Sequence, residues 1–503
     1  MNDARRILFV TSNGTGLGHL TRSMAIARRL ESGVEPFVIT FSAAAPVVRR
    51  QGFPVEYIAS YDRPGAGTDM SWTFRTRDRL RVAVGEISPD VVVFDGTHPY
   101  ERLLPALRST GAALVWCRRA MWRADADTAP LHRSHLFDAV LEPGELDPQA
   151  DAGPTPPRRA EAHAVDPIVL LDRPELDGRA EAERALGLEP GKRHVLVQLG
   201  QGAGVREATA SALRRMAAMP GVEAAALASH LAALDDVPEG VVRLESTYPI
   251  ARHYAAFDAA VSAAGYNAFH ELTAAGVPAL FVPIDRQTDD QAARARGAER
   301  AGTGLAVRGP GDPQLGARLA ELLEPARQAE LRAALDGLGQ WRGAEQAARW
   351  LEGLASPTSG STPDGRHGET GPNMGVRARR AWIFASTVPR TIARVVSQRL
   401  RRPRTRVVVL ALGLDAADHE AQTSRALAEA GEPPERVLVV TDRLDFSRLL
   451  RAGVGFEHVP AAGERQAELA ADAYEGFRAR RIELILARRP RPRRVIALRS
   501  GAR

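Results

Sequence analysis

The chain has 503 residues, of which 44% are hydrophobic and 25% are charged. This composition is typical of a soluble globular protein and argues against a collagen-like, disordered or membrane-embedded chain. At roughly 100–200 residues per domain, we expect about three to four structural units. The single cysteine, Cys117, excludes an intrachain disulfide and a metal site with several cysteine ligands. Because no long apolar run and no signal-peptide pattern occur, we expect a cytoplasmic protein.

Charge is unevenly distributed along the chain. The net charge is +6, from 67 basic and 61 acidic residues. Residues 371–503 hold 26 of the basic and 14 of the acidic residues, a net of +12, whereas the other 41 basic and 47 acidic residues give −6. All basic residues except Lys192 are arginines, so we attribute the high isoelectric point to composition and expect no nucleic-acid partner. The sequence predicts a mildly acidic body with a basic tail.

Short apolar runs alternate with helical patterns in the first part of the chain. The predicted strands cover residues 7–11, 35–40, 91–94 and 113–117. Because these runs lack strict polar–apolar alternation, they suit parallel strands that are buried on both faces. We therefore predict a Rossmann-like, doubly wound lobe for residues 1–165. The charged, proline-rich segment 151–164 is expected to form the hinge after this lobe or its approach.

The same rhythm restarts after Asp166. Predicted strands cover residues 195–199, 224–228, 259–262 and 279–282, and a helix around 341–354 ends this block. The pattern predicts a second Rossmann-like lobe over residues 166–355.

The rest of the chain has a different character. Residues 356–375 are expected to form a flexible linker, because they include a run rich in Pro, Gly, Ser and Thr. Residues 376–503 are predicted to hold a basic helical segment and a small α/β extension, with strands at 407–412, 437–440 and 456–459. The basic segment, 377–406, has apolar residues at three- and four-residue steps. It is suited to an anionic membrane surface, although its apolar face could equally pack on the body.

A glycine-rich loop follows the first predicted strand. Gly14, Gly16 and Gly18 precede His19, which stands where the loop becomes a helix. Glycines let the backbone approach a ligand closely, and a helix N-terminus favours negative charge. The G-x-G-x-G spacing is neither the dinucleotide fingerprint nor a Walker loop. The alternative is a tight strand–helix turn with a structural histidine.

A longer motif spans residues 262–291 and reads strand, glycine turn, helix, Gly-Val-Pro turn, strand and polar loop. Gly265 permits a turn at the helix start, where Asn267 and free backbone amides can bind an anion. Glu271 follows Asn267 by one helical turn on the same face. An amide and a carboxylate at this spacing fit a diphosphate beside a ribose diol. The alternative is a buried helix with a solvated glutamate.

Together these motifs resemble nucleotide-sugar-dependent glycosyltransferases of the GT-B fold, and in particular glycosyltransferase family 28. That family includes the N-acetylglucosaminyl transferase of the peptidoglycan lipid precursor, and the longer motif is also similar to the donor signature of UDP-glycosyltransferases. The resemblance covers roughly residues 5–355. It implies an N-terminal acceptor lobe and a C-terminal donor lobe, with a nucleotide sugar as substrate and no metal or other cofactor.

The resemblance also implies roles for single residues. Gly265 and Asn267 are expected to hold the diphosphate, and Glu271 to bond the ribose. Asp290 and Gln291 are expected to contact the donor sugar.

Further roles follow from the glycine-rich loops. Gly200 and Gly202 match the loop that meets the nucleotide after the first strand of the second lobe, and residues 246–250 match the place where backbone groups meet the nucleobase. His19 is the expected catalytic base, in a phosphate or acceptor loop formed by the glycines at positions 14, 16 and 18.

Three features depart from the relatives. The N-terminal loop has fewer consecutive glycines than is usual in the family. Ala263 and Ala264 stand where UDP-glycosyltransferases usually carry His or Ser and a second Gly, and Asp290 replaces a glutamine of the peptidoglycan enzyme. These changes leave the identity of the nucleotide and the sugar open and argue against the peptidoglycan enzyme itself.

Other polar residues have alternative explanations. Asp95 follows a predicted strand and could orient His19 or bind the acceptor, or could simply end the strand. Asp125 and Asp127 match the D-x-D of metal-dependent transferases but lie in an alanine-rich segment, which favours a solvated loop. The histidines at 132 and 135 have nothing nearby in the sequence to complete a metal site.

We predict an inverting, metal-independent transferase that moves a hexosyl or N-acetylhexosaminyl group from a UDP-sugar to an acceptor hydroxyl. The acceptor would be a lipid-linked sugar, a polysaccharide or a small molecule, and the enzyme would be cytoplasmic or peripheral at the inner face of the membrane. Two alternatives stay open: a GT-B sugar-nucleotide 2-epimerase, whose acidic residues and arginine the sequence does not match, and a non-catalytic sugar-nucleotide-binding subunit of a surface-polysaccharide pathway.

Overall fold

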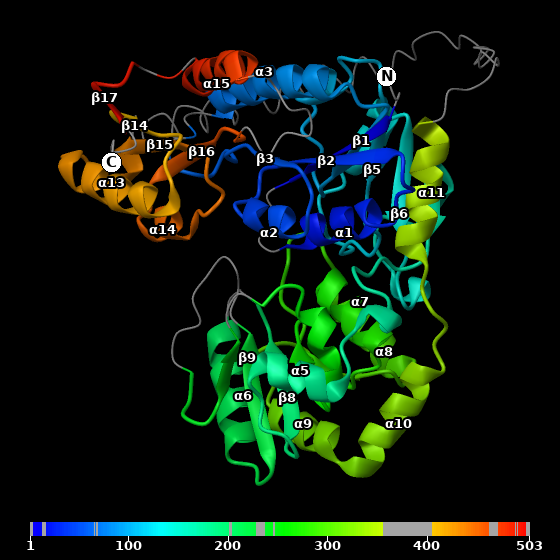
Figure 1. The fold of residues 1–503 in the computed structure, drawn as a ribbon. Coiled ribbons are helices and arrows are strands. Elements are labelled where there is room, and N and C mark those ends of the chain that lie inside the picture. The colour runs from blue at the N-terminus through cyan, green and yellow to red at the C-terminus, as the bar shows by residue number, and fades with distance from the viewer. Residues whose placement is uncertain are drawn as a thin grey trace, which may run out of the picture.

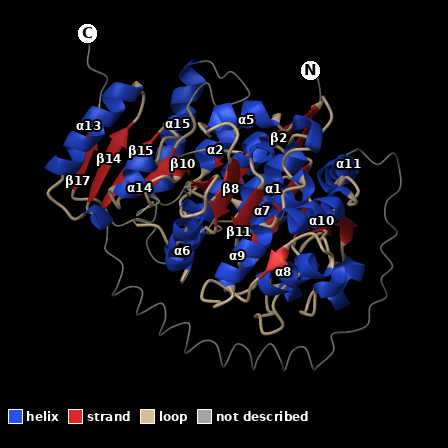
Figure 2. Cartoon of the chain, turned by 90° about the horizontal axis from the view of Figure 1, so that it is seen from below, coloured by secondary structure: helices blue, strands red, loops and turns tan. Residues whose placement is uncertain are grey.

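The computed structural model describes residues 4–12, 17–64, 66, 69–200, 204–227, 237–244, 247–355, 405–461, 471–487, 489 and 491–498. Within these residues, three parallel sheets follow one another along the chain (Figure 1). Helices lie on both sides of the strands, as the view from below shows (Figure 2). The arrangement confirms the predicted α/β class, with two Rossmann-like lobes and a small C-terminal α/β extension.

The N-terminal lobe contains a parallel sheet in the order β3-β2-β1-β4-β5-β6-β7. Its strands are β1 (Arg5–Thr11), β2 (Val34–Thr40), β3 (Val55–Tyr57), β4 (Val91–Asp95), β5 (Ala113–Cys117), β6 (Ala139–Pro143) and β7 (His163–Val165). Its α-helices are α1 (Gly18–Ala27), α2 (Ala45–Arg50), α3 (Asp69–Ile87) and α4 (Leu104–Leu107). The strand order reverses between β1 and β4, where Thr11 pairs with Asp95. Ligands of open α/β sheets bind beyond the carboxyl ends of such strands.

The C-terminal lobe repeats this plan in the order β10-β9-β8-β11-β12-β13. Its strands are β8 (Arg193–Gln198), β9 (Val222–Leu227), β10 (Val242–Leu244), β11 (Ala259–Ser262), β12 (Ala279–Phe281) and β13 (Leu305–Ala306). The helices after β7 are α5 (Arg179–Leu186), α6 (Val205–Ala217), α7 (Tyr266–Ala275), α8 (Gln291–Arg300), α9 (Leu315–Leu323), α10 (Pro325–Asp336) and α11 (Gly343–Ala355). Here the order reverses between β8 and β11, and Gln198 pairs with Ser262.

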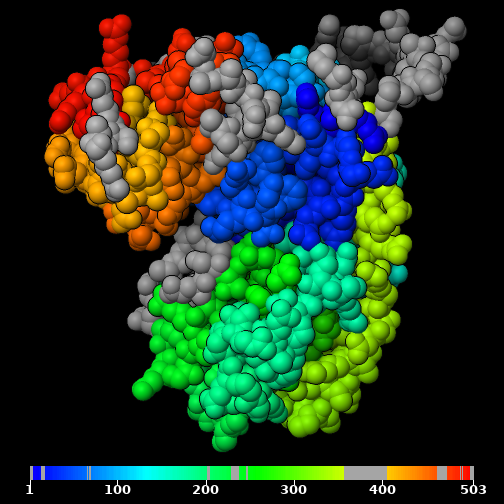
Figure 3. Space-filling view, viewed as in Figure 1, coloured from blue at the N-terminus to red at the C-terminus, as the bar shows by residue number. Residues whose placement is uncertain are grey.

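The C-terminal unit, residues 405–498, has a smaller parallel sheet in the order β16-β15-β14-β17. Its strands are β14 (Val407–Ala411), β15 (Val437–Thr441), β16 (Gly455–His458) and β17 (Arg494–Ala497), and its α-helices are α13 (Ala416–Glu429), α14 (Ser447–Arg451) and α15 (Ala471–Leu486). The unit lies against the N-terminal lobe (Figure 3). The predicted linker and nearly all of the basic segment 377–406 lie outside the described residues.

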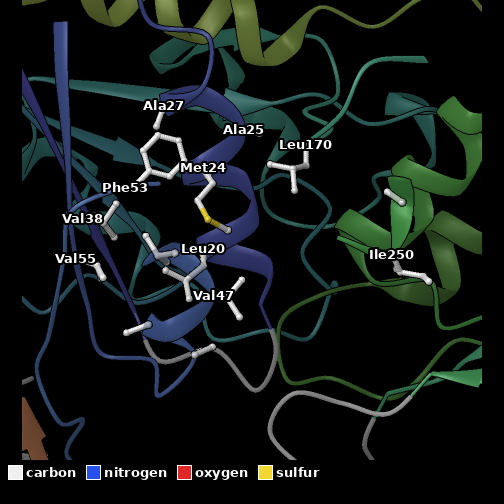
Figure 4. Packing of buried hydrophobic residues seen from close by; sticks show 14 of the residues in the cluster. Leu20, Met24, Ala25, Ala27, Val38, Val47, Phe53, Val55, Leu170 and Ile250 are labelled. Atoms are coloured by element: carbon white, nitrogen blue, oxygen red, sulfur yellow. The ribbon is translucent and has the colours of Figure 1, made fainter. Parts of the chain in front are cut away.

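The central strands are buried on both faces, as their uninterrupted apolar runs predict. In β1, Ile7 and Phe9 belong to one core cluster, whereas Leu8 and Val10 belong to a second cluster on the opposite face. Helix α1 covers the first face, and its Met24 packs there among other apolar side chains (Figure 4). This packing fixes the start of α1 next to the ends of β1 and β4.

Helix α11 differs from the prediction that residues 166–355 all belong to the second lobe. It contacts α1, β1, β4 and β7 and therefore packs on the N-terminal lobe, not on the lobe whose sequence block it ends (Figure 1). Trp350 stacks on His163 with ring centroids 4.5 Å apart, and the Glu352 carboxylate accepts a hydrogen bond from the Glu31 amide at 2.7 Å. The reason is that the apolar face of α11, including the fully buried Leu351, completes the N-terminal core.

In the described part of the chain, no helix combines the length and the apolar character needed to cross a membrane.

Candidate active site

The two Rossmann-like lobes face each other across a cleft of about 730 Å³ at the carboxyl ends of their central strands. The cleft is lined by six residues that the sequence predicted as site residues: Gly18, His19, Gly200, Gly265, Asn267 and Gln291. The structure thus brings the predicted base and most of the predicted donor motif to one place, although they are far apart in the sequence.

His19 and Asp95 form a hydrogen-bonded pair on the N-terminal wall. His19 lies in the first turn of α1 and Asp95 is the last residue of β4; His19 Nδ1 is 2.7 Å from Asp95 Oδ1. An ionised carboxylate only accepts hydrogen bonds, so Nδ1 carries the proton and Nε2 is left as an acceptor. This is the geometry that an orienting role of Asp95 requires.

The protonation of this pair follows from its surroundings. Burial lowers the pKa of His19 below its ordinary value, and this outweighs the raising influence of Asp95. For Asp95, burial alone would raise the pKa, but the charge of Arg22 and the hydrogen bonds from His19 and Arg22 outweigh it and keep that pKa below its usual range. The pair therefore rests as neutral imidazole and carboxylate, the state in which His19 can accept a proton.

The opposite wall is the start of helix α7. Gly265 precedes the helix in an extended conformation, and its first turn carries no acidic residue. The Asn267 side-chain amide donates across the cleft to the Gly18 carbonyl at 3.2 Å. Gly200, which has a left-handed φ of +71°, lines the cleft from the end of β8. The free amides of a helix start are suited to bind an anionic group here.

Glu271 lies apart from the residues that line this cleft. It lines a small separate pocket with Leu171 and Ala251, and its charge influences the half-buried Tyr248 and the buried Tyr254. Burial raises the pKa of Glu271 to about 8. Glu271 lies near Tyr248, in the segment that begins at Thr247. For Glu271 to bond the ribose, a bound nucleotide would therefore have to extend from the cleft toward this segment.

The structure gives two adjacent aspartates different surroundings. Asp289 lines the cleft together with Gln291, whereas Asp290 does not. Asp290 is the N-cap of α8, and its Oδ1 accepts a hydrogen bond from the Ala293 amide at 2.8 Å. The motif placed Asp290 in the site, but the start of α8 turns this carboxylate onto the helix.

An interlobe charge cluster, formed by Arg119, Glu145, Asp289 and Arg294, was not predicted from the sequence. Arg294 of α8 donates two hydrogen bonds to Glu145 of the N-terminal lobe, at 2.8 and 2.7 Å, and one to Asp289 at 3.0 Å. Arg119 of the N-terminal lobe donates to Asp289 at 3.1 Å. Burial opposes ionisation of Asp289, but the two arginines lower its pKa to about 2. The cluster holds the lobes together beside the cleft.

Sequence signals for the missed residues are weak but identifiable. Arg22 follows His19 by one helical turn, and Arg119 follows the end of β5 by two residues. Thr97 and His98, which also line the cleft, come directly after the end of β4.

The D-x-D segment is a surface loop. The Asp125 carboxylate pairs with Arg123 at 2.8 Å, and Asp127 accepts a hydrogen bond from the Ala129 amide at 2.9 Å. Among the described residues, no group of His, Cys, Asp and Glu side chains could hold a metal ion. Gly14, Gly16, Gly202 and position 246, which the sequence also assigned to the site, lie outside the described residues.

Comparisons with known proteins decide the family. Residues 241–335 match the model of the glycosyltransferase family 28 C-terminal domain. A protein of Nocardioides sp., named UDP-N-acetylglucosamine--N-acetylmuramyl-(pentapeptide) pyrophosphoryl-undecaprenol N-acetylglucosamine transferase, is 30% identical over 322 residues, which are 59% of this chain and 83% of that protein. The chain belongs to glycosyltransferase family 28. It is therefore a glycosyltransferase, as the sequence predicted.

Further proteins are similar to this chain. A Nocardia farcinica protein of the same name is 28% identical over 372 residues, which cover 68% of this chain and 94% of the relative. A crystal structure of Acinetobacter baumannii MurG aligns with 69% of this chain and 99% of its own, at 16% identity and a TM-score of 0.46.

Proposed function

We propose that this family 28 protein transfers a hexosyl or N-acetylhexosaminyl group from a UDP-sugar to an acceptor hydroxyl, without a metal and with inversion at the anomeric carbon. One observation carries the proposal: His19, paired with Asp95, lies on one wall of the cleft and the start of α7 lies on the other. A base and an anion-binding helix end that face each other suit direct displacement of a nucleotide diphosphate.

In the proposed reaction, the acceptor oxygen attacks the anomeric carbon while its proton passes to Nε2 of His19. The bond between the anomeric carbon and the diphosphate oxygen breaks, and its electron pair leaves on the diphosphate. Asp95 holds the Nδ1 proton and stabilises the imidazolium that forms. Backbone amides at the start of α7, after Gly265, stabilise the charge that develops on the leaving diphosphate. A single displacement of this kind inverts the sugar.

For the acceptor, the names of the relatives supply the argument. They describe a pyrophosphoryl-undecaprenol-linked acceptor. We therefore place a lipid-linked sugar ahead of a polysaccharide or a small molecule. Such an acceptor would bring the enzyme to a membrane surface, for which the basic segment 377–406 is the predicted contact.

The donor and the reaction type are tested together. UDP-, TDP- and GDP-sugars are screened by thermal shift, and the stabilising donor is then tested for turnover with and without EDTA, with the product followed by NMR. We expect an inverted glycoside, formed equally well in EDTA. An epimerised free sugar nucleotide would indicate the 2-epimerase, binding without turnover would indicate a non-catalytic subunit, and activity that needs added Mg²⁺ would contradict metal independence.

The role of His19 is tested by the His19→Ala variant. We expect kcat to fall by about 10²–10⁴-fold, because a positioned general base is lost, while donor affinity changes little. Exposed His132, on the surface of the same lobe, provides the matched control, and His132→Ala is expected to keep wild-type kcat. Wild-type kcat in folded His19→Ala would end the general-base proposal.

A further inference from the structure

Arg22 is a buried residue beside the predicted base that the proposed reaction does not use. It follows His19 by one turn of α1, and its side chain is 2% exposed. Its Nε donates to Asp95 Oδ2 at 3.0 Å, and its NH2 group donates to Asp95 Oδ1 at 2.5 Å. Both carboxylate oxygens are thus bound by one guanidinium, a geometry that fixes the carboxylate as well as neutralising it.

The same guanidinium also reaches the imidazole. The Arg22 NH2 group is 3.2 Å from His19 Nδ1, and Asp95 Oδ1 lies close to both. Because a guanidinium only donates hydrogen bonds, the Nδ1 proton is directed to Asp95. Any imidazolium formed at His19 would have a cation as its immediate neighbour.

Arg22 is held in place from the other lobe. Its guanidinium carbon lies 5.4 Å from the centroid of the Tyr266 ring, the first residue of α7. The Tyr266 hydroxyl donates to the Gly144 carbonyl and accepts from the Ile168 amide, both at 3.0 Å. The ring is therefore fixed, and the guanidinium is packed between Asp95 and the helix start that faces the cleft.

We propose that Arg22 is a positioning residue that sets the orientation and the charge state of His19, so that the imidazole stays neutral and its Nε2 stays free to accept a proton. The inference rests on the proposed function, in which His19 is the base. It adds that the Asp95 carboxylate acts as part of a buried ion pair and not as an isolated partner of the histidine.

Several charged or titratable groups surround this site. They are Asp95 at the end of β4, Arg22 on α1, Arg119 and Cys117 at the end of β5, and Tyr266 on α7. Burial lowers the pKa of His19, Asp95 raises it, and Arg22 and Arg119 lower it. Removal of the Arg22 charge leaves Asp95 without its counter-ion, so the pKa of His19 must rise.

The test compares Arg22→Gln, which removes the charge, with Arg22→Lys, which keeps it. The pKa of His19 is measured by NMR on histidine-labelled full-length protein, and the pH profile of kcat/KM is recorded in parallel. We expect Arg22→Gln to raise the His19 pKa by about one unit, which is a tenfold change in its proton affinity. The acid limb of the profile should move by the same amount. Arg22→Lys keeps the charge but not the contact with both Asp95 oxygens, so its His19 pKa should lie closer to wild type than that of Arg22→Gln. Arg349→Gln, an exposed charge change on α11, should leave both readouts at wild type.

The outcomes separate this inference from the proposed function. An unchanged His19 pKa in Arg22→Gln would overturn the role of Arg22. A raised pKa without movement of the acid limb would confirm Arg22 and remove His19 as the base. If Arg22→Gln does not fold, wild-type ring ¹⁵N shifts still decide the orientation: a proton on Nδ1 supports the inference, and a proton on Nε2 alone contradicts it. A merely structural arginine would lower the melting temperature and leave both pH readouts in place.

Discussion

Among single residues, Glu271 of helix α7 has a protonation state that differs from that of an exposed glutamate. Its pKa is raised to about 8 by burial, far above the ordinary 4.5 that it has in an unfolded chain. The folded protein therefore keeps this proton up to about pH 8, whereas the unfolded chain releases it near pH 4.5. The contribution of Glu271 to the free energy of unfolding is therefore greatest below pH 4.5. It decreases as the pH rises from 4.5 toward 8.

We predict that Glu271→Gln removes this pH dependence, because glutamine imitates the neutral carboxyl group. At pH 8 the variant should be more stable than the wild type by about 3–4 kcal/mol, and at pH 5 the two should differ by less than about 1 kcal/mol. Urea unfolding at both pH values measures the difference, with the exposed Glu330→Gln as the control. If the free energy of unfolding changes with pH in the variant as it does in the wild type, Glu271 is ionised in the folded protein.

The neighbouring aspartates of α8 give a second prediction. Asp290→Ala should lower stability by about 1 kcal/mol through loss of the N-cap, and should leave donor affinity unchanged. Asp289→Asn should instead weaken donor binding or turnover, because Asp289 lines the cleft and orders Arg119 and Arg294. Thermal unfolding and donor titration on both variants show which aspartate supports donor binding. Loss of donor binding in Asp290→Ala alone would support the sequence-based assignment.

At the scale of elements, the sequence predicted most strands with apolar runs, but it missed the buried strand β6. The central strands β1, β4, β8 and β11 carry continuous apolar runs and were found. Strands β3, β7 and β10 have three residues each and are edge strands of their sheets. An edge strand pairs with only one other strand and is less buried, so it needs few apolar residues and gives a weak sequence signal. Strand β7 overlaps the segment 151–164, which its prolines and charges predicted to be a hinge.

The site was predictable to the same extent. His19 and Asn267 stand in loops whose glycines and helix starts have a local signature, and both line the cleft. Arg22 has only its spacing from His19 as a signal, and Asp289 and Arg294 have no signature of this kind, since the roles of all three depend on which charged group of another element they meet. Helix α11 illustrates the same limit: its apolar stripe predicts a helix, but the sheet that it covers is decided by packing between lobes.

At the scale of the molecule, buried charges join the parts. Between the lobes, the interlobe charge cluster is accompanied by two backbone hydrogen bonds, from Arg123 to the Thr288 carbonyl at 2.7 Å and from Asp290 to the Met121 carbonyl at 3.0 Å. These contacts lie beside the cleft and join the lobe that carries His19 to the lobe that carries the start of α7. Breaking such a pair leaves an uncompensated buried charge, which is costly.

The C-terminal unit is attached to the N-terminal lobe by the same means. Glu457 at β16 accepts a hydrogen bond from Arg79 of α3 at 2.7 Å and one from Arg489 at 2.8 Å. Arg481 of α15 reaches Glu56 at 3.1 Å, and the Tyr57 ring stacks on Phe456 with centroids 5.4 Å apart. These five charged side chains are each at most 10% exposed. The unit is therefore a docked part of the N-terminal lobe and not a loosely tethered one.

We predict that Glu457→Gln destabilises this docking by about 3–5 kcal/mol, because Arg79 and Arg489 each lose a buried charged partner. The C-terminal unit should then be released by limited proteolysis earlier than in the wild type, while donor affinity stays unchanged, since Glu457 does not line the cleft. Glu420→Gln is the matched control, because its pair with Arg448 lies on the exposed surface of the same unit and should contribute no more than about 1 kcal/mol. Equal protease resistance in Glu457→Gln and the wild type would show that aromatic packing alone holds the unit, and a loss of donor affinity would show that the docked unit also supports the cleft.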